Sequence, residues 1–285
     1  MAHLRIVAVL GQGVVPPDTP VLTATDPAVV GDGLIETMHV RDGRPWLADE
    51  HLDRLLGAAR AIGLTTPPRA ELAALLAEVC APWPPGREGA LRLVCTSGPP
   101  ERDAPTAFAT LSEVDPQVRR TRRSGISVAT LPLGIAATAR ADAPWLLGGV
   151  KSSSRAVHIA AQRWAATRGV DDVLWTSTDG YALEGPTANL VWLDGDVLCT
   201  VPAATTGVLP GVTAAWLLAH AGDLGWRTAE RMVTPDQLRR AAGVWFTSSV
   251  RGAAEVRVLD GAPLPASPHT RAIQDLMGYP VTGDS

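Results

Sequence analysis

Lysine, cysteine and aromatic residues are scarce in this chain of 285 residues. Cys80, Cys95 and Cys199 lie far apart and form no CxxC pair, which argues against a disulfide framework and a zinc knuckle. We therefore expect a cytoplasmic protein without a metal site. No window approaches the ~18 uninterrupted apolar residues of a membrane span, so no membrane association is expected.

Net charge is also small, at −4, with a pI near 5.9. Nucleic acids and anionic membranes are bound by clustered cations, and we expect neither as a partner. Apolar residues make up 46% of the chain and charged residues 19%, which is typical of a globular protein. A small molecule is the expected ligand, and the length predicts about two domains.

The chain has one lysine, Lys151, among its 25 basic residues. Arginine serves a solvated cation equally well, but only lysine can lose its proton and act as a nucleophile, because guanidinium stays protonated in proteins. Two interpretations stay open from composition: Lys151 is there by chance, or the protein needs a primary amine.

Periodicity and turn signals predict a small α/β domain over residues 1–114. An Asp42-Gly43 pair predicts a hairpin. The other elements predicted there are two or three strands within residues 5–37, helices over 50–62 and 69–80, and strands over 90–95 and 107–111.

Residues 115–124 contain several arginines without an apolar period, which is typical of a linker. Residues 125–285 are predicted to form a second, larger domain. Its predicted elements are strands over 126–131, 172–176, 181–184, 190–193, 197–200 and 244–246, and helices over 154–168 and 212–221.

Several residues of the chain match the needs of a pyridoxal-phosphate site: a lysine amine, a carboxylate for the pyridine nitrogen, and donors for the phosphate. Lys151 precedes a predicted helix, and Glu184 ends an apolar strand. The phosphate donors would be the Val212 amide and Thr213 at a predicted helix start, the hydroxyls of Ser248 and Ser249, and Arg54. Taken singly, each residue also fits a cap, a turn or a solvated surface.

Six segments in a fixed order make the pattern more specific. They are Gly31-Asp32-Gly33-Leu34-Ile35-Glu36-Thr37, His51-Leu52-Asp53-Arg54-Leu55, Lys151 with Arg155, residues 179–190 (DGYALEGPTANL), residues 207–213 (GVLPGVT), and Thr247-Ser248-Ser249 followed by Leu259-Asp260-Gly261. Across nearly the whole chain this order resembles the class IV fold of pyridoxal-phosphate enzymes. That family includes branched-chain aminotransferases, D-amino-acid aminotransferases and 4-amino-4-deoxychorismate lyases.

The resemblance implies an α/β (α+β) fold with a small N-terminal α/β domain and a larger C-terminal pseudo-barrel domain. It also implies pyridoxal 5'-phosphate as the cofactor, with Lys151 forming the Schiff base and Glu184 pairing with the pyridine nitrogen. Arg54, Val212, Thr213 and Ser249 would then hold the phosphate. A homodimer is implied too, with the loop at residues 98–105 reaching the neighbouring subunit.

Departures from the family pattern bear on the reaction. Arg155 stands where aminotransferases commonly carry tyrosine against the cofactor oxygen, which is similar to some lyases, and Ala28 replaces another usual tyrosine. Both favour the lyase. Arg92 and Arg102 are the candidates for binding a substrate carboxylate, and Arg102 resembles the loop arginine of D-amino-acid aminotransferases. Ser154 replaces a usual asparagine near the lysine.

The resemblance thus leads us to expect a lyase that converts 4-amino-4-deoxychorismate to 4-aminobenzoate and pyruvate for folate biosynthesis. The first alternative is an aminotransferase acting on D-amino or branched-chain amino acids with a 2-oxoacid acceptor. The second is a non-catalytic relative that binds the cofactor or a partner protein.

Overall fold

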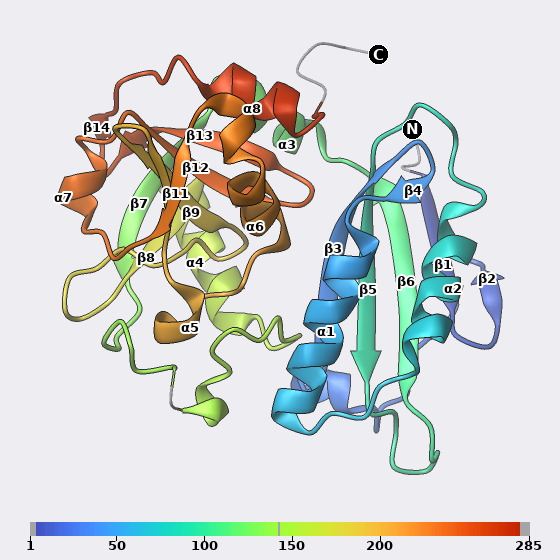
Figure 1. Cartoon of the computed structure of the whole chain (residues 1–285). Helices are drawn as coiled ribbons and strands as arrows, with labels where there is room; N and C mark the ends of the chain where they lie inside the picture. Colours follow the sequence, from blue (N-terminus) through green and yellow to red (C-terminus); the bar gives the residue numbers. More distant parts are fainter. Residues whose placement is uncertain (1–3, 142, 280–285) are drawn as a thin grey trace. The chain divides into compact units, whose positions relative to one another are not determined.

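The computed structural model describes residues 4–141 and 143–279, and the chain divides into two compact units (Figure 1). Unit 1 comprises Met1–Asp115 and Val150–Arg155, and unit 2 comprises Pro116–Gly149 and Ala156–Ser285. Each unit encloses its own cluster of buried apolar side chains. The segment that carries Lys151 therefore belongs with the N-terminal unit, whereas the sequence pattern assigned it to the C-terminal domain.

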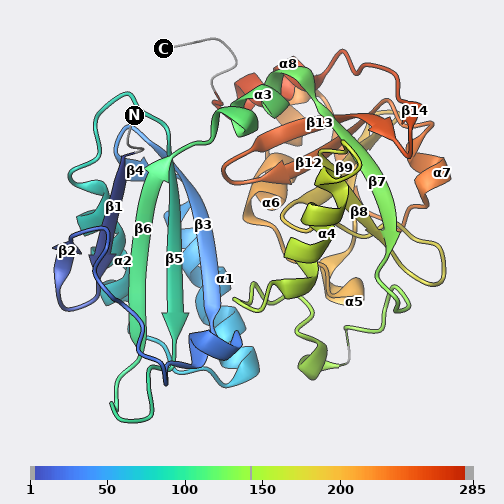
Figure 2. The ribbon, with the colours of Figure 1, turned by 180° about the vertical axis from the view of Figure 1, so that it is seen from behind.

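Unit 1 is a sheet with two helices on one face (Figures 1 and 2). Its described residues form a six-stranded sheet of order β2-β1-β6-β5-β3-β4, in which all neighbouring strands are antiparallel. The strands are β1 (Arg5–Val9), β2 (Gly13–Val15), β3 (Leu34–Arg41), β4 (Arg44–Pro45), β5 (Gly89–Thr96) and β6 (Thr106–Glu113). The helices are the short 3-10 helix η1 (Pro27–Val30), α1 (Ala48–Ile62) and α2 (Arg69–Cys80).

Helical periodicity accounts for α1 and α2, which match their predicted ranges closely. Leu52, Leu55 and Ala59 recur on one face of α1 and are buried, and each fully buried leucine contributes roughly 1.5–3 kcal/mol. Gly63 ends α1 with a φ of 71°, a left-handed conformation that glycine adopts without strain.

The predicted hairpin joins β3 to β4. Asp42 and Gly43 both have positive φ, at 48° and 71°, as a type I′ turn requires. Arg41 and Arg44 pair across this turn.

Unit 2 is a curled mixed sheet surrounded by short helices. Its described residues form an eight-stranded sheet of order β11-β10-β9-β12-β13-β7-β8, with β14 paired to β13. The pairs β10–β11, β13–β7 and β7–β8 are parallel and the others are antiparallel. The strands are β7 (Ile126–Pro132), β8 (Asp172–Thr176), β9 (Asn189–Asp194), β10 (Val197–Thr200), β11 (Arg227–Glu230), β12 (Gly243–Ser248), β13 (Gly252–Leu259) and β14 (Ala262–Pro263).

The helices of unit 2 are mostly one to three turns long. They are α3 (Pro116–Ser124), η2 (Pro144–Leu146), α4 (Ala156–Ala166), α5 (Ala203–Thr206), α6 (Val212–Ala219), η3 (Ala221–Leu224), α7 (Pro235–Leu238) and α8 (Thr270–Leu276).

Two predicted segments differ in the structure. The segment expected as a linker forms helix α3 instead, and its Arg122 side chain is almost fully buried. An apolar period could not reveal a helix whose buried residues are Thr121 and Arg122. The strand expected over residues 181–184 makes only isolated bridges, such as Glu184 to Asn189.

All three cysteines are free thiols in buried positions. Burial raises the pKa of Cys80 to about 11 and that of Cys95 to about 12. None of the helices in the described part of the chain is long and apolar enough to cross a membrane.

Candidate functional site

The backbone around Lys151 is fastened to the first residues of β3. Ile35 donates its N–H to the Lys151 carbonyl at 3.0 Å, and Ser153 donates its N–H to the Gly33 carbonyl at 2.8 Å. The Ser153 hydroxyl also donates to the Gly31 carbonyl at 2.9 Å. The single lysine therefore has a fixed place beside the strand that follows the Gly-Asp-Gly motif.

The two glycines of that motif are needed for this approach. Gly31 has a φ of 84°, and a Cβ there would lie 3.2 Å from the Cβ of Ser154. A Cβ on Gly33 would lie 3.0 Å from the Cys95 carbonyl oxygen and 3.2 Å from Ser153 Oγ. The serines after Lys151 thus pack against backbone that has no room for a side chain.

Arg54 lies in the same unit, on α1, and is held by the buried carboxylate of Glu36. Arg54 Nε donates to Glu36 Oε1 at 2.8 Å, and its Nη2 donates to Oε2 at 2.6 Å. His51 Nδ1 is 2.7 Å from the same Oε2 and is the donor, because an ionised carboxylate only accepts. This bidentate pairing fixes the plane of the Arg54 guanidinium.

The protonation of this cluster follows from burial and the neighbouring charges. Burial alone would raise the pKa of Glu36, but the charge of Arg54 and the hydrogen bonds from His51 and Arg54 outweigh it and lower that pKa to about 2. Burial, together with the charges of Arg54 and Lys151, lowers the pKa of His51. Glu36 is therefore an anion and His51 is neutral near pH 7.

The open face of the unit 1 sheet carries a hollow of about 310 Å³. It is lined by Arg5, Thr37, Ala90, Leu91, Arg92, Thr110 and Ser112. Burial and the nearby charge of Arg92 both lower the pKa of the Arg155 guanidinium. The structure therefore brings Arg92 and Arg155, two of the predicted site residues, within electrostatic reach of each other.

The other two candidate substrate residues of unit 1 lie in loops or short turns. Ala28 is in η1, where its N–H donates to Asp26 Oδ1 at 3.0 Å. Arg102 is exposed in the loop between β5 and β6.

In unit 2, Glu184 is a half-buried carboxylate with two directed donors. Its Oε2 accepts the Leu209 N–H at 3.0 Å, and its Oε1 accepts from Arg140 Nη2 at 3.4 Å. The next residue is a glycine because a Cβ on Gly185 would lie 2.7 Å from the Phe246 ring. Sequence reasoning missed Arg140, which stands in an alanine-rich loop without a motif.

The predicted phosphate donors of unit 2 lie together. Thr213 Oγ1 and Ser249 Oγ are 3.1 Å apart, and both residues are buried. Thr213 and Val212 belong to the first turn of α6, where backbone N–H groups lack helical partners. Ser248 is the last residue of β12, directly before Ser249, and is half-buried.

Asn189 supports the start of this helix. Its Nδ2 donates to the Leu209 carbonyl at 2.6 Å, and a Cβ on Gly211 would lie only 1.8 Å from Asn189 Oδ1. Position 211 therefore requires glycine, because Asn189 occupies the space that a side chain would need.

Comparison of the whole chain with known proteins finds members of one family. The model of the class IV amino-transferases matches residues 33–259. The bifunctional aminodeoxychorismate lyase / D-amino acid transaminase of Mycobacterium tuberculosis is 37% identical over 98% of this chain and 100% of its own. A D-alanine aminotransferase of Bacillus licheniformis is 27% identical over 86% of each chain.

A solved structure is also similar to this chain. A hypothetical aminotransferase from Mycobacterium tuberculosis, in its PLP-bound form, superposes with a TM-score of 0.91 at 36% identity. The superposition covers 96% of this chain and 98% of that one.

The Glu36 cluster predicts a specific loss of stability in acid. Because the pKa of Glu36 is lower in the folded chain than its ordinary value of 4.5, its contribution is complete above about pH 4.5 and is lost as the pH falls toward 2. Glu36→Gln should lower the free energy of unfolding at pH 7 by roughly 3 kcal/mol. Urea denaturation should show this difference from wild type shrinking at pH 3.

Glu78→Gln, on the exposed side of α2, is the control and should behave as wild type at both pH values. A Glu36→Gln deficit of equal size at pH 7 and pH 3 would contradict the ionised carboxylate.

Proposed function

Because this chain belongs to the class IV amino-transferase family, we propose that it is a pyridoxal-phosphate-dependent lyase. It would convert 4-amino-4-deoxychorismate to 4-aminobenzoate and pyruvate. The relative that joins lyase and D-amino acid transaminase in one protein supports this reaction and the aminotransferase alternative alike. The choice between them therefore depends on residues of this chain.

The observations that carry the choice are the hollow lined by Arg92 and the electrostatic interaction of Arg92 with Arg155. Arg92 lines a hollow that also contains Arg5 and hydroxyl side chains, and its charge acts on Arg155. 4-Amino-4-deoxychorismate bears two carboxylates, whereas D-alanine bears one. Two neighbouring guanidinium groups suit a substrate with two carboxylates, because each guanidinium can form a bidentate pair with one carboxylate.

The donor set of the chain fits pyridoxal 5'-phosphate. The hydroxyl oxygens of Thr213 and Ser249 are buried beside the start of α6 and lie 3.1 Å apart, which suits a phosphate. The Glu184 carboxylate, already held by the Leu209 N–H, suits a protonated ring nitrogen. When bound, the cofactor supplies an electron sink for the carbon that bears the substrate amine.

The protein's own residues would then divide the work. Thr213, Ser249 and the Val212 amide bind the phosphate, and Arg54 adds a guanidinium held in place by Glu36. Lys151 would hold the cofactor through its side-chain amine.

Lys151 Nζ then accepts the proton from the ring carbon that bears the substrate amine. The bond between the ring and the enolpyruvyl oxygen would break as the ring becomes aromatic. The enolpyruvate released would take up the proton held by Lys151 Nζ and become pyruvate. In the aminotransferase alternative, the same Nζ would transfer the substrate proton, and the cofactor would carry the amino group to the 2-oxoacid.

That alternative is favoured by a specific observation, the exposed Arg102 in the loop between β5 and β6. An exposed loop arginine is available to bind the carboxylate of a small amino acid, and the D-alanine aminotransferase relative is consistent with it. A homodimer in which this loop reaches the neighbouring subunit stays a prediction.

Lys151 should be the sole site of covalent cofactor attachment. Borohydride reduction of the protein with pyridoxal 5'-phosphate should add the cofactor mass to the peptide that contains Lys151, because the chain has no other lysine. Mass spectrometry measures this directly. Lys151→Arg keeps the charge and should take up none; attachment at the N-terminal amine in the wild type would refute the assignment.

Glu184→Gln should retain the cofactor but slow turnover. The change keeps the side-chain size and removes the charge that holds the ring nitrogen protonated, so we expect about a 10²-fold loss, or ~2.7 kcal/mol. Steady-state kinetics and an absorbance titration of the cofactor separate the two effects. Glu230→Gln, at an exposed position on β11, is the control, and undiminished turnover of Glu184→Gln would exclude the proposed role.

Product analysis tests the proposed reaction itself. With 4-amino-4-deoxychorismate as the sole substrate, pyruvate and 4-aminobenzoate should form in equal amounts without any 2-oxoacid. In parallel, D-alanine or a branched-chain amino acid is supplied with 2-oxoglutarate, and Lys151→Arg serves as the inactive control. If amino transfer proves much faster than pyruvate release, the aminotransferase replaces the lyase; turnover of neither would favour the non-catalytic relative.

A further inference from the structure

Three successive carbonyls in the turn between β12 and β13 are bound by two buried side chains. The Ser249 carbonyl accepts the hydroxyl of Tyr279. The Val250 carbonyl accepts Arg122 Nη2 at 2.5 Å, and the Arg251 carbonyl accepts Arg122 Nε at 3.1 Å. We refer to Arg122 and Tyr279 as the carbonyl clamp.

The two clamp residues contact each other and come from distant parts of the sequence. The guanidinium carbon of Arg122, on α3, lies 4.7 Å from the centre of the Tyr279 ring. Tyr279 follows α8 and lies beyond residues 33–259, the part of the chain that the family model matches. Gly252 makes room for the ring, because a Cβ there would lie 2.9 Å from it.

Burial makes the clamp more than ordinary packing. Arg122 is 1% exposed and Tyr279 is 3% exposed. A guanidinium is costly to bury unless its donors are satisfied, and here two of them bind turn carbonyls. An apolar side chain would fill the same space but would leave those carbonyls without these donors.

The clamp fixes the backbone that carries Ser249. In a trans peptide the C=O and the following N–H point in opposite directions, so binding three carbonyls in a row fixes three peptide planes. Ser249 lies at the first of them, with its Oγ 3.1 Å from Thr213 Oγ1.

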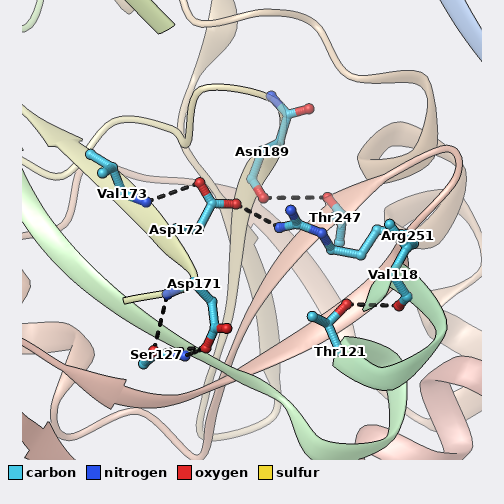
Figure 3. Close-up of polar contacts among 9 residues, drawn as sticks. All are labelled: Val118, Thr121, Ser127, Asp171, Asp172, Val173, Asn189, Thr247 and Arg251. Atoms are coloured by element: carbon cyan, nitrogen blue, oxygen red, sulfur yellow. Dashed lines mark hydrogen bonds and ion pairs between the residues drawn. The ribbon is translucent and has the colours of Figure 1, made fainter. Parts of the chain in front are cut away.

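Further contacts hold the rest of the turn (Figure 3). Arg251 donates to Asp172 Oδ2 at 2.7 Å, and the Thr247 hydroxyl donates to the Asn189 carbonyl at 3.4 Å. Thr247, in β12, and Arg251, in the turn, are therefore held by residues of neighbouring strands. The three carbonyls of the turn are held by the clamp.

We propose that Arg122 and Tyr279 are positioning residues for phosphate binding, which hold the turn so that Ser249 Oγ meets Thr213 Oγ1. This inference rests on the proposed role of those two hydroxyls in binding the cofactor phosphate. The clamp residues do not touch the phosphate; they act through the Ser249 backbone. Loss of the clamp should thus weaken a ligand that carries a phosphate and spare one that lacks it.

Tyr279→Phe is the most direct test. It keeps the ring, its packing on Gly252 and its contact with Arg122, and removes only the hydroxyl that binds the Ser249 carbonyl. Tyr181→Phe is the matched control, because Tyr181 is the only other tyrosine of the chain. The full-length protein, freed of cofactor, is titrated separately with pyridoxal 5'-phosphate and with pyridoxal, following tryptophan fluorescence.

We expect Tyr279→Phe to raise the Kd for pyridoxal 5'-phosphate by about five-fold, the effect of losing one hydrogen bond, and to leave the Kd for pyridoxal unchanged. Tyr181→Phe should change neither. An unchanged affinity for pyridoxal 5'-phosphate, or an equal loss for both ligands, would overturn the proposal. If Tyr279→Phe does not fold, Arg122→Lys is measured instead, because it keeps the charge but loses the paired donors. The quantity compared is again the Kd for pyridoxal 5'-phosphate relative to the Kd for pyridoxal.

Ser249→Ala separates this inference from the function on which it rests. If Ser249→Ala does not weaken pyridoxal 5'-phosphate relative to pyridoxal, the hydroxyl does not bind the phosphate and the proposed site is wrong there. If Ser249→Ala shows the selective loss and Tyr279→Phe does not, the phosphate site stands and only the clamp is refuted.

Discussion

The buried ion pair between Glu36 and Arg54 is the interaction on which the chemistry proposed for unit 1 depends. A carboxylate with no exposed surface stays ionised only beside a compensating charge, and Arg54 provides it through two short hydrogen bonds. The same pairing sets the direction of the guanidinium before any ligand arrives. With His51 neutral, the cluster has no net charge.

That neutrality bears on how a phosphate would be bound. An arginine already paired with a carboxylate offers directed hydrogen bonds more than an uncompensated positive charge. The donors proposed in unit 2 are also uncharged, since they are the hydroxyls of Thr213 and Ser249 and the first amides of α6. Binding would therefore depend on the placement of donors, which is the property that the proposed carbonyl clamp would control at Ser249.

Local signals in the sequence predict a large part of this structure. The periodicity of α1 and α2 and the Asp-Gly hairpin depend on neighbouring residues, and the structure has them where expected. The glycine motifs were also informative, because glycine is required where no side chain fits. The role of the single lysine stays a prediction. The glycines of Gly31-Asp32-Gly33 and Gly211 occupy places where a Cβ would collide with a neighbour.

The remaining features depend on contacts between distant residues. The helical linker segment packs through an arginine, the segment at residues 150–155 joins β3 across more than 100 residues, and Tyr279 reaches back to Ser249. Neither periodicity nor composition contains such information. Glu36 and His51 lay within recognisable motifs, yet their role follows only from the geometry that places both on Arg54.

The buried cysteines have a consequence for how the molecule withstands oxidants. Thiolate is the reactive form of cysteine, and a pKa of about 11 or 12, as at Cys80 and Cys95, leaves roughly one thiol in 10⁴ or fewer ionised at pH 7. Cys199 is buried as well, and burial raises its pKa. Peroxide or an alkylating reagent therefore finds almost no cysteine thiolate, and inactivation by such agents would have to occur through another residue.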